Sequence, residues 1–244
     1  MELTPIERAA LLEIKKRGVL STGGPLWPKE YLPNAWRTNS DCAYRFLTEC
    51  CWSFNEADQG SIALIPDLEY IKWFCERWCE NRSNGGVLIC EKSRRLIMSW
   101  VCRGLELWAM GLKPQKFVIC GLNYARSAEH VWRIAFLYNQ LRERRPEFNL
   151  PPCTTRGGNM AAQLIVQTIL PNGSITQCLN QMGQSFQGSG YSGVTMEEFS
   201  QYKNPSYMYS QARRVTEGKP GKPGGFVVAI TNAFPGDDWK QLKK

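Results

Sequence analysis

The chain has 244 residues, 43% of them hydrophobic, which is enough to bury one sizeable core. No run of about 18 apolar residues occurs, and the opening helical pattern is charged, so a membrane span and a signal peptide are excluded and a cytosolic protein is expected. Its 30 basic and 22 acidic residues give a formal net charge of +8, which favours a polyanionic partner such as nucleic acid.

The first part of the chain predicts two helices. The first starts at Thr4, a suitable N-cap residue, and stops at Gly18. A second helical pattern covers residues 41–52. We therefore expect a small helical N-terminal lobe over residues 1–60, followed by the main domain over residues 61–244.

Strand and helix patterns alternate through the middle of the chain. They predict a helix over 67–82, a strand over 86–90, a helix over 99–110 that closes at Gly111, a strand over 116–122, and a helix from Ser127, its N-cap, to Pro146. Such alternation is typical of a mostly parallel sheet covered by helices, an α/β fold.

The pattern changes after Pro151. Two apolar segments flank the turn sequence Pro171-Asn172-Gly173, which predicts an antiparallel hairpin. A short strand over 191–196, a helix over 205–215 and a final strand over 226–231 follow, with a loop rich in Gly, Pro and Lys before the last strand.

The ten cysteines fall mostly inside apolar periodic segments, as Cys75, Cys79 and Cys102 do, and we interpret them as reduced core residues. A zinc site is not expected, because the chain has no C-x-x-C pair and a single histidine. That histidine, His130, lies in a helical pattern and is interpreted as structural.

The loop sequence EKSRRLIMSW lies between a predicted strand and a predicted helix, where a nucleotide-binding fold carries its phosphate loop. Lys92 and Arg94 would supply cations for phosphate, and Ser99 a hydroxyl for magnesium. The loop departs from G-x-x-x-x-G-K-[ST], since Ile97 and Met98 occupy the places of the second glycine and the lysine. A basic strand-to-helix turn without a ligand is the alternative.

Two further strand ends carry polar residues. Glu197 and Glu198 end an apolar strand, as in a Walker B motif, in which the first carboxylate supports magnesium and the second orients the attacking water. Two solvated acids are the alternative. Thr231 and Asn232 end the last strand, where they would sense the terminal phosphate or simply form a turn.

The order of these three elements reproduces a P-loop NTPase of the additional-strand, catalytic-glutamate type. The sequence also resembles the large terminase family of tailed phages and prophages, specifically the N-terminal ATPase domain. KSRRLIMS is similar to the deviant Walker A of some terminases, which place the phosphate-contacting lysine at the start of the loop. Lys92 matches that lysine, and Arg94 matches a loop arginine that stabilises charge on the transferred phosphoryl group. The resemblance implies that the nucleotide is bound by Lys92, Ser93, Arg94, Arg95 and Ser99.

Other segments extend the resemblance. Residues 44–78 look like the family's entry segment, in which Tyr70 would be an adenine neighbour. Residues 185–199 resemble the approach to Walker B, although Glu197 replaces the usual aspartate, and TNAFPG resembles the coupling motif containing Thr231 and Asn232.

The resemblance implies hydrolysis of ATP with Mg²⁺, in which Ser99 and Glu197 hold the metal and Glu198 is the catalytic carboxylate. It implies double-stranded DNA, a portal protein and a small terminase subunit as partners. It also implies a homo-oligomeric ring during packaging, a monomer in isolation, and a location in the bacterial cytoplasm at the prohead.

DNA phosphates would be contacted by Arg213, Arg214, Lys219 and Lys222, although a solvated basic loop explains these residues equally well. Full terminases continue into a nuclease domain. Asp237 and Asp238 are insufficient for one, so we expect no nuclease activity and a fragment of a longer protein or an engineered domain. The alternative functions are another nucleic-acid-dependent P-loop ATPase, such as a helicase, and a nonenzymatic DNA-binding assembly protein with a decayed P-loop.

Overall fold

The computed structural model describes residues 24–34, 37–55, 60–93, 97–157, 165–179, 190–217 and 224–232. The helix predicted from Thr4 to Gly18 lies outside these ranges.

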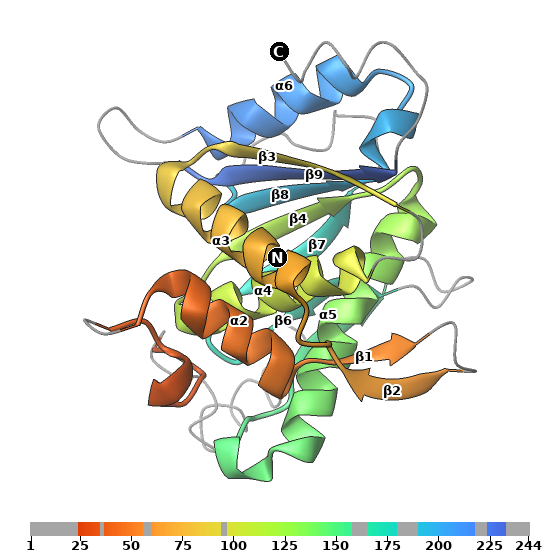
Figure 1. Ribbon diagram of the computed structural model, residues 1–244. Helices are drawn as coiled ribbons and strands as arrows, with labels where there is room; N and C mark the ends of the chain where they lie inside the picture. Colours follow the sequence, from red (N-terminus) through yellow and green to blue (C-terminus); the bar gives the residue numbers. More distant parts are fainter. Residues whose placement is uncertain are drawn as a thin grey trace.

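A seven-stranded sheet forms the centre of the fold (Figure 1). Its strands are β3 (Val87–Lys92), β4 (Lys116–Cys120), β5 (Thr154–Gly157), β6 (Ile165–Ile169), β7 (Ile175–Leu179), β8 (Gly193–Glu197) and β9 (Phe226–Asn232). In the order β3-β9-β8-β4-β7-β6-β5, the first five strands are parallel and β6 runs antiparallel to both of its neighbours. The predicted mostly parallel sheet and the β6–β7 hairpin are therefore confirmed. β5 was not predicted, because its sequence TTRG is fully exposed and carries no apolar pattern.

Helices cover both faces of this sheet. One face carries α2 (Asn39–Cys50), α3 (Glu69–Asn84), α4 (Met98–Leu112) and α5 (Tyr124–Arg144), and the other carries α6 (Pro205–Thr216) (Figure 1). Short 3-10 turns lie at η1 (Lys29–Tyr31), η2 (Pro146–Phe148) and η4 (Phe199–Gln201).

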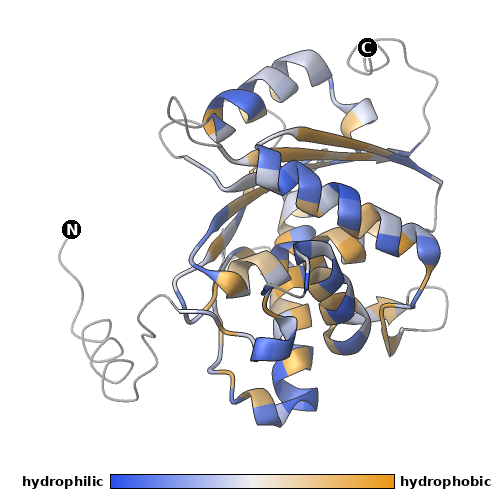
Figure 2. Cartoon of the chain, turned by 60° about the vertical axis from the view of Figure 1, so that its left-hand side comes forward, coloured by the Kyte–Doolittle hydropathy of each residue, from blue (hydrophilic) through white to orange (hydrophobic). Residues whose placement is uncertain are grey.

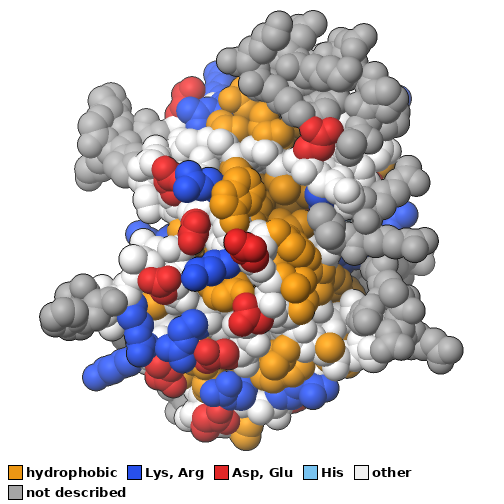
Figure 3. Space-filling model, viewed as in Figure 1, with side chains coloured by type: hydrophobic (Ala, Val, Ile, Leu, Met, Phe, Trp, Pro, Cys, Tyr) orange, Lys and Arg blue, Asp and Glu red, His pale blue; other side chains and the backbone are white. Residues whose placement is uncertain are grey.

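Alternate side chains of β9 pack on opposite faces of the sheet, because successive residues of a strand point to opposite sides. Phe226, Val228 and Ile230 join the core beneath α2–α5, whereas Val227 and Ala229 join the core beneath α6. Figure 2 shows the result as hydrophobic strands between helices whose outer faces are hydrophilic. Figure 3 shows that hydrophobic side chains also reach the surface, in a band through the middle of the face seen in Figure 1.

The described residues before position 60 pack on the same core as the rest of the chain. The Trp27 indole donates to the Trp108 carbonyl oxygen at 2.8 Å, and the Trp108 indole donates to the Tyr31 carbonyl oxygen at 3.0 Å. A Cβ at Gly111 would approach the Trp27 ring to 1.9 Å, so only glycine allows this contact. The predicted boundary at residue 60 falls in the turn of an antiparallel hairpin, β1 (Trp52–Asn55) with β2 (Ser61–Leu64), which the helical-lobe prediction did not include.

One predicted helix start is wrong. α5 begins at Tyr124 rather than after Ser127, because the Asn123 side chain caps it by accepting from the Arg126 amide at 2.9 Å. Ser127 instead lies in the first turns of the helix, and its hydroxyl accepts from the Gly121 amide at 2.7 Å.

All ten cysteines are free, and eight of them are buried, which agrees with the interpretation that most of them are core residues. Within the described part of the chain, no helix combines the length and apolarity that crossing a membrane requires.

The Trp27 contacts predict that truncating this side chain destabilises the whole domain. We expect Trp27→Ala to lower the free energy of unfolding by about 3–5 kcal/mol, since it removes a buried indole that is 3% exposed. Trp73→Ala is the control, because Trp73 is 55% exposed, and its effect should stay within about 0.5 kcal/mol. Denaturant unfolding of both variants measures the difference, and equal effects would show that residues before 60 are not part of the cooperative core.

Candidate nucleotide-binding site

Five of the ten predicted site residues meet at the carboxyl edge of the parallel strands. In the sheet, β9 lies between β3 and β8, and Lys92 at the end of β3 is opposite Asn232 at the end of β9. Glu197 ends the next strand, β8. A cavity of about 920 Å³ opens at this edge and is lined by Lys92, Ser99, Glu197, Glu198 and Asn232, among others. Ligands of open α/β sheets bind at this edge.

Lys92 supplies a cation from the strand end. Its Nζ donates to Asn232 Oδ1 at 3.1 Å, which holds the ammonium group at the cavity. Met98, where a standard P-loop has its lysine, is only 3% exposed and belongs to the core, so this position cannot present a charge to the cavity. The cation at this edge of the sheet therefore comes from Lys92 at the end of β3, while Met98 packs in the core.

The remaining loop residues are placed less fully. Ser93 is exposed and does not line the cavity. Arg94 and Arg95 lie outside the described residues.

The start of α4 is suited to an anion. Ile97 precedes the helix without a side-chain cap, and the first turn contains no acidic residue. The amide groups of a first helical turn have no intrahelical partners and carry partial positive charge, which favours phosphate. This end of α4 contributes Ser99 to the cavity wall.

The side-chain oxygen atoms of Ser99 and Glu197 lie next to each other at the cavity. Ser99 Oγ donates to Glu197 Oε2 at 3.1 Å, linking the first turn of α4 to the end of β8. The other carboxylate oxygen, Oε1, is buried and has no hydrogen-bond partner among the described residues. A carboxylate and a hydroxyl beside a phosphate site are the ligands that Mg²⁺ takes in nucleotide-binding folds, so these residues fit that ion.

Glu198 adopts a left-handed backbone conformation, with φ 55° and ψ 36°. Consecutive residues of a strand would point to opposite faces, but this bend brings the side chains of Glu197 and Glu198 to one cavity. A glutamate in this region carries backbone strain, which is typical of functional sites.

Besides Ser93, two further predicted residues are absent from the cavity lining. Thr231 is 1% exposed, and its hydroxyl accepts from the Ser200 amide at 3.2 Å, which ties β9 to the turn that follows β8. Tyr70 lies in the first turn of α3 and is not among the lining residues, so its contact with adenine stays a prediction.

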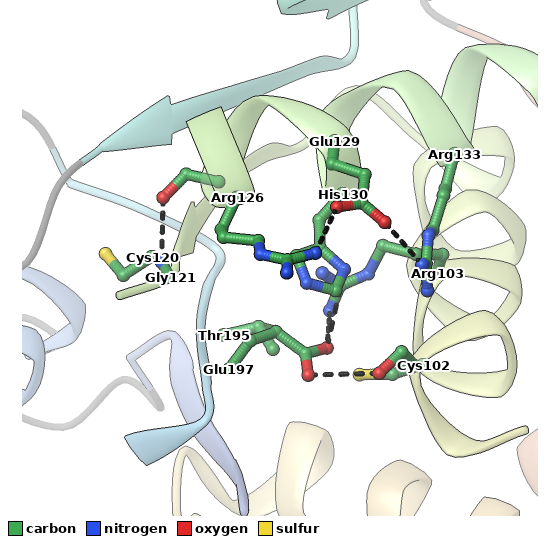
Figure 4. Close-up of polar contacts among 12 residues, drawn as sticks. Cys102, Arg103, Cys120, Gly121, Arg126, Glu129, His130, Arg133, Thr195 and Glu197 are labelled. Atoms are coloured by element: carbon green, nitrogen blue, oxygen red, sulfur yellow. Dashed lines mark hydrogen bonds and ion pairs between the residues drawn. The ribbon is translucent and has the colours of Figure 1, made fainter. Parts of the chain in front are cut away.

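One face of α5 forms a wall of the cavity that the sequence did not indicate. Arg126, Glu129, His130 and Arg133 line it, and Figure 4 shows their side chains along this face. Glu129 forms ion pairs with Arg126 at 3.1 Å and with Arg133 at 2.6 Å. Their helical spacing places these residues on one face of α5, but the sequence does not show that this face borders the cavity.

His130 is buried, as its structural interpretation requires, but it also approaches the Glu197 carboxylate. Its Nδ1 lies 3.8 Å from Glu197 Oε1. Burial, followed by the positive charges of Arg103 and Arg133, holds the pKa of His130 well below its usual range, so the imidazole is neutral at physiological pH.

An apolar wall lies beside these polar groups. Phe54 and Leu64 of the β1–β2 hairpin line the cavity together with Ile97 and Trp100. Phe136 supports this wall, since its ring centroid lies 6.4 Å from Phe54 and 5.6 Å from Trp100. The sequence missed this surface because the hairpin itself was not predicted.

The strain at Glu198 predicts a gain in stability on substitution. Glu198→Asn should raise the free energy of unfolding by about 0.5–1 kcal/mol, because asparagine tolerates the left-handed region better than glutamate. Glu198→Ala removes the same charge but retains the strain, so it should give no comparable gain. Denaturant unfolding compares the two, and equal stabilities would show that charge rather than backbone strain governs this position.

Comparison with known proteins gives structural similarity only. No protein-family model and no curated protein matches the chain. The large terminase of bacteriophage HK97 superposes with a TM-score of 0.59 at 13% identity, over 80% of this chain and 38% of that one. The Thermus phage P74-26 large terminase ATPase domain gives a TM-score of 0.43 at 13% identity, over 61% of this chain and 60% of that one. The N-terminal domain of the phi29 DNA packaging ATPase gives a TM-score of 0.41 at 10% identity, over 69% of this chain and 82% of that one. The chain thus spans about 38% of the HK97 protein and shares its fold, which confirms the predicted fold class.

Proposed function

We propose that the chain is the ATPase motor domain of a phage large terminase subunit and hydrolyses ATP with Mg²⁺ to move double-stranded DNA into a prohead. One observation carries this proposal: Lys92, Ser99 and the Glu197–Glu198 pair, predicted from separate motifs, line one cavity at the carboxyl edge of a sheet with β9 between the two motif strands. The similarity in fold to the HK97 large terminase supports it.

In this mechanism each described residue has a separate task. Lys92 and the amide end of α4 hold the phosphates, while Ser99 and Glu197 would hold magnesium, which supplies neutralisation of phosphate charge. Glu198 orients the attacking water and accepts its proton. Asn232 accepts a hydrogen bond from Lys92 at 3.1 Å, so loss of the terminal phosphate near Lys92 would change the contacts of Asn232 at the end of β9.

The nucleobase would bind against the apolar wall formed by Phe54, Leu64, Ile97 and Trp100. A flat aromatic base is stabilised there by stacking on aromatic side chains and by removal of its faces from water. This assignment replaces Tyr70, which lies outside the cavity lining.

The partners proposed from this function are double-stranded DNA, a portal protein, a small terminase subunit and further copies in a ring, in the cytoplasm of a bacterial host. Arg214 is exposed on α6 and free to face a DNA phosphate, whereas Arg213 donates to the Gly85 carbonyl oxygen at 3.0 Å. Lys219 and Lys222 lie outside the described residues, as do Asp237 and Asp238, the acids judged insufficient for a nuclease.

The buried position of Met98 argues against a decayed P-loop. In a decayed P-loop no lysine would replace the standard one at the strand-to-helix turn, but Lys92 lines the cavity from the end of β3. We therefore retain an active ATPase over a nonenzymatic DNA-binding protein.

The assigned catalytic carboxylate predicts a loss of turnover. Glu198→Gln should reduce magnesium-dependent ATP hydrolysis by about 10²-fold or more, because the amide cannot accept a proton from water. Glu76→Gln, the same change at an exposed position of α3 outside the cavity, should leave the rate unchanged. Phosphate release measures both, and equal rates in wild type and Glu198→Gln would reject the assignment of the base.

The position of Lys92 predicts its role in binding. Lys92→Ala should weaken ATP binding by about 10- to 100-fold, the loss expected for a charged hydrogen bond to phosphate. Lys72→Ala, an exposed lysine of α3, is the control. Titration with a fluorescent ATP analogue separates the two, and an unchanged affinity in Lys92→Ala would contradict the early-lysine arrangement.

A further inference from the structure

Beneath the Walker B carboxylate lies a buried arginine that the proposed chemistry does not use. Arg103 of α4 is 0% exposed, and its Nη2 lies 3.6 Å from Glu197 Oε1. Figure 4 shows Arg103 and His130 approaching Glu197 from two helices. The guanidinium faces away from solvent and does not line the cavity, so it is not available to a phosphate.

The sequence spacing sets two turns of α4 against one face of β8. Ser99, Arg103 and Glu106 follow one another at four and three residues, which places them on the same side of the helix. Thr195 and Glu197 are two residues apart on the strand and share a face.

Three contacts therefore join α4 to β8, one after another along the helix. Ser99 contacts Glu197 at 3.1 Å, Arg103 contacts Glu197 at 3.6 Å, and Glu106 accepts from Thr195 at 2.5 Å. Arg103 is held at the centre of this ladder by Glu106, with 2.9 Å between Nη2 and Oε1.

Such a charge is expensive to bury, because removing an ion from water costs several kcal/mol. Apolar side chains of similar volume would fill the space at lower cost, so the packing of α4 does not by itself explain an arginine here. Its contact with Glu197 does, because Glu197 Oε1 is buried without a hydrogen-bond partner among the described residues and Arg103 Nη2 lies 3.6 Å from it.

We propose, on the basis of the proposed ATPase function, that Arg103 is a positioning residue that holds Glu197 Oε1, so that Oε2 beside Ser99 is the oxygen presented to magnesium. Arg103 touches neither nucleotide nor metal in this arrangement. It acts through Glu197 and fixes the distance between the phosphate-loop helix and the Walker B strand.

The test compares nucleotide binding with and without magnesium. Removing Arg103 alone would leave Glu106 buried without its partner, so the main variant combines Arg103→Met with Glu106→Gln, which retains an acceptor for Thr195. Arg82→Met is the control, since Arg82 is a half-buried arginine of α3 that stacks over Trp108 and does not line the cavity. Affinity for N-methylanthraniloyl-ADP is measured in EDTA and in magnesium chloride, after unfolding curves confirm that each variant is folded.

We expect the double variant to bind the nucleotide in EDTA as wild type does, but to lose about 10- to 100-fold of the gain in affinity that magnesium provides. Arg103→Lys should recover part of that gain, because it keeps the charge and loses the forked geometry. A double variant that keeps the full magnesium gain, or that loses affinity equally in EDTA and magnesium, would overturn the inference. Wild-type protein that binds no nucleotide under either condition would overturn the proposed function itself, and this inference with it.

Discussion

The site depends on the insertion of β9 between β3 and β8. Parallel strands lie about 5 Å apart, so the ends of β3 and β8 are separated by about 10 Å, with the tip of β9 between them. That spacing would leave room for the phosphates of the proposed nucleotide between the Lys92 cation and the Glu197 carboxylate. The hydrogen bond from Ser99 to Glu197 then closes the arrangement, because it ties the helix that follows β3 to the end of β8.

The two hydrophobic cores keep this spacing rigid. Alternate residues of β9 pack beneath α2–α5 and beneath α6, so the strand cannot shift without disturbing both layers. The N-terminal residues add to the same restraint, since Trp27 packs against Gly111 at the far end of α4. The helix that carries Ser99 is thus fixed at both ends.

Departures from standard motifs have local physical explanations. Met98 replaces the usual lysine and is part of the core, while Lys92 supplies the charge from the strand. Glu198 accepts a strained backbone, which turns two consecutive acids toward one cavity. In both cases the departure accompanies a polar group directed to the carboxyl edge of the sheet, Lys92 in the first case and Glu198 in the second.

The sequence by itself determined the alternation of strands and helices, the turn at Pro171-Asn172-Gly173 and the three polar strand ends, because these depend on local periodicity and turn chemistry. Only the tertiary structure decided which residues share the cavity. It brought His130 and the β1–β2 hairpin to the site and directed Thr231 to Ser200 instead. It also set Arg103 beneath Glu197, 94 positions later in the chain. Helical or strand spacing defines one face of an element, but packing between distant elements decides what that face meets.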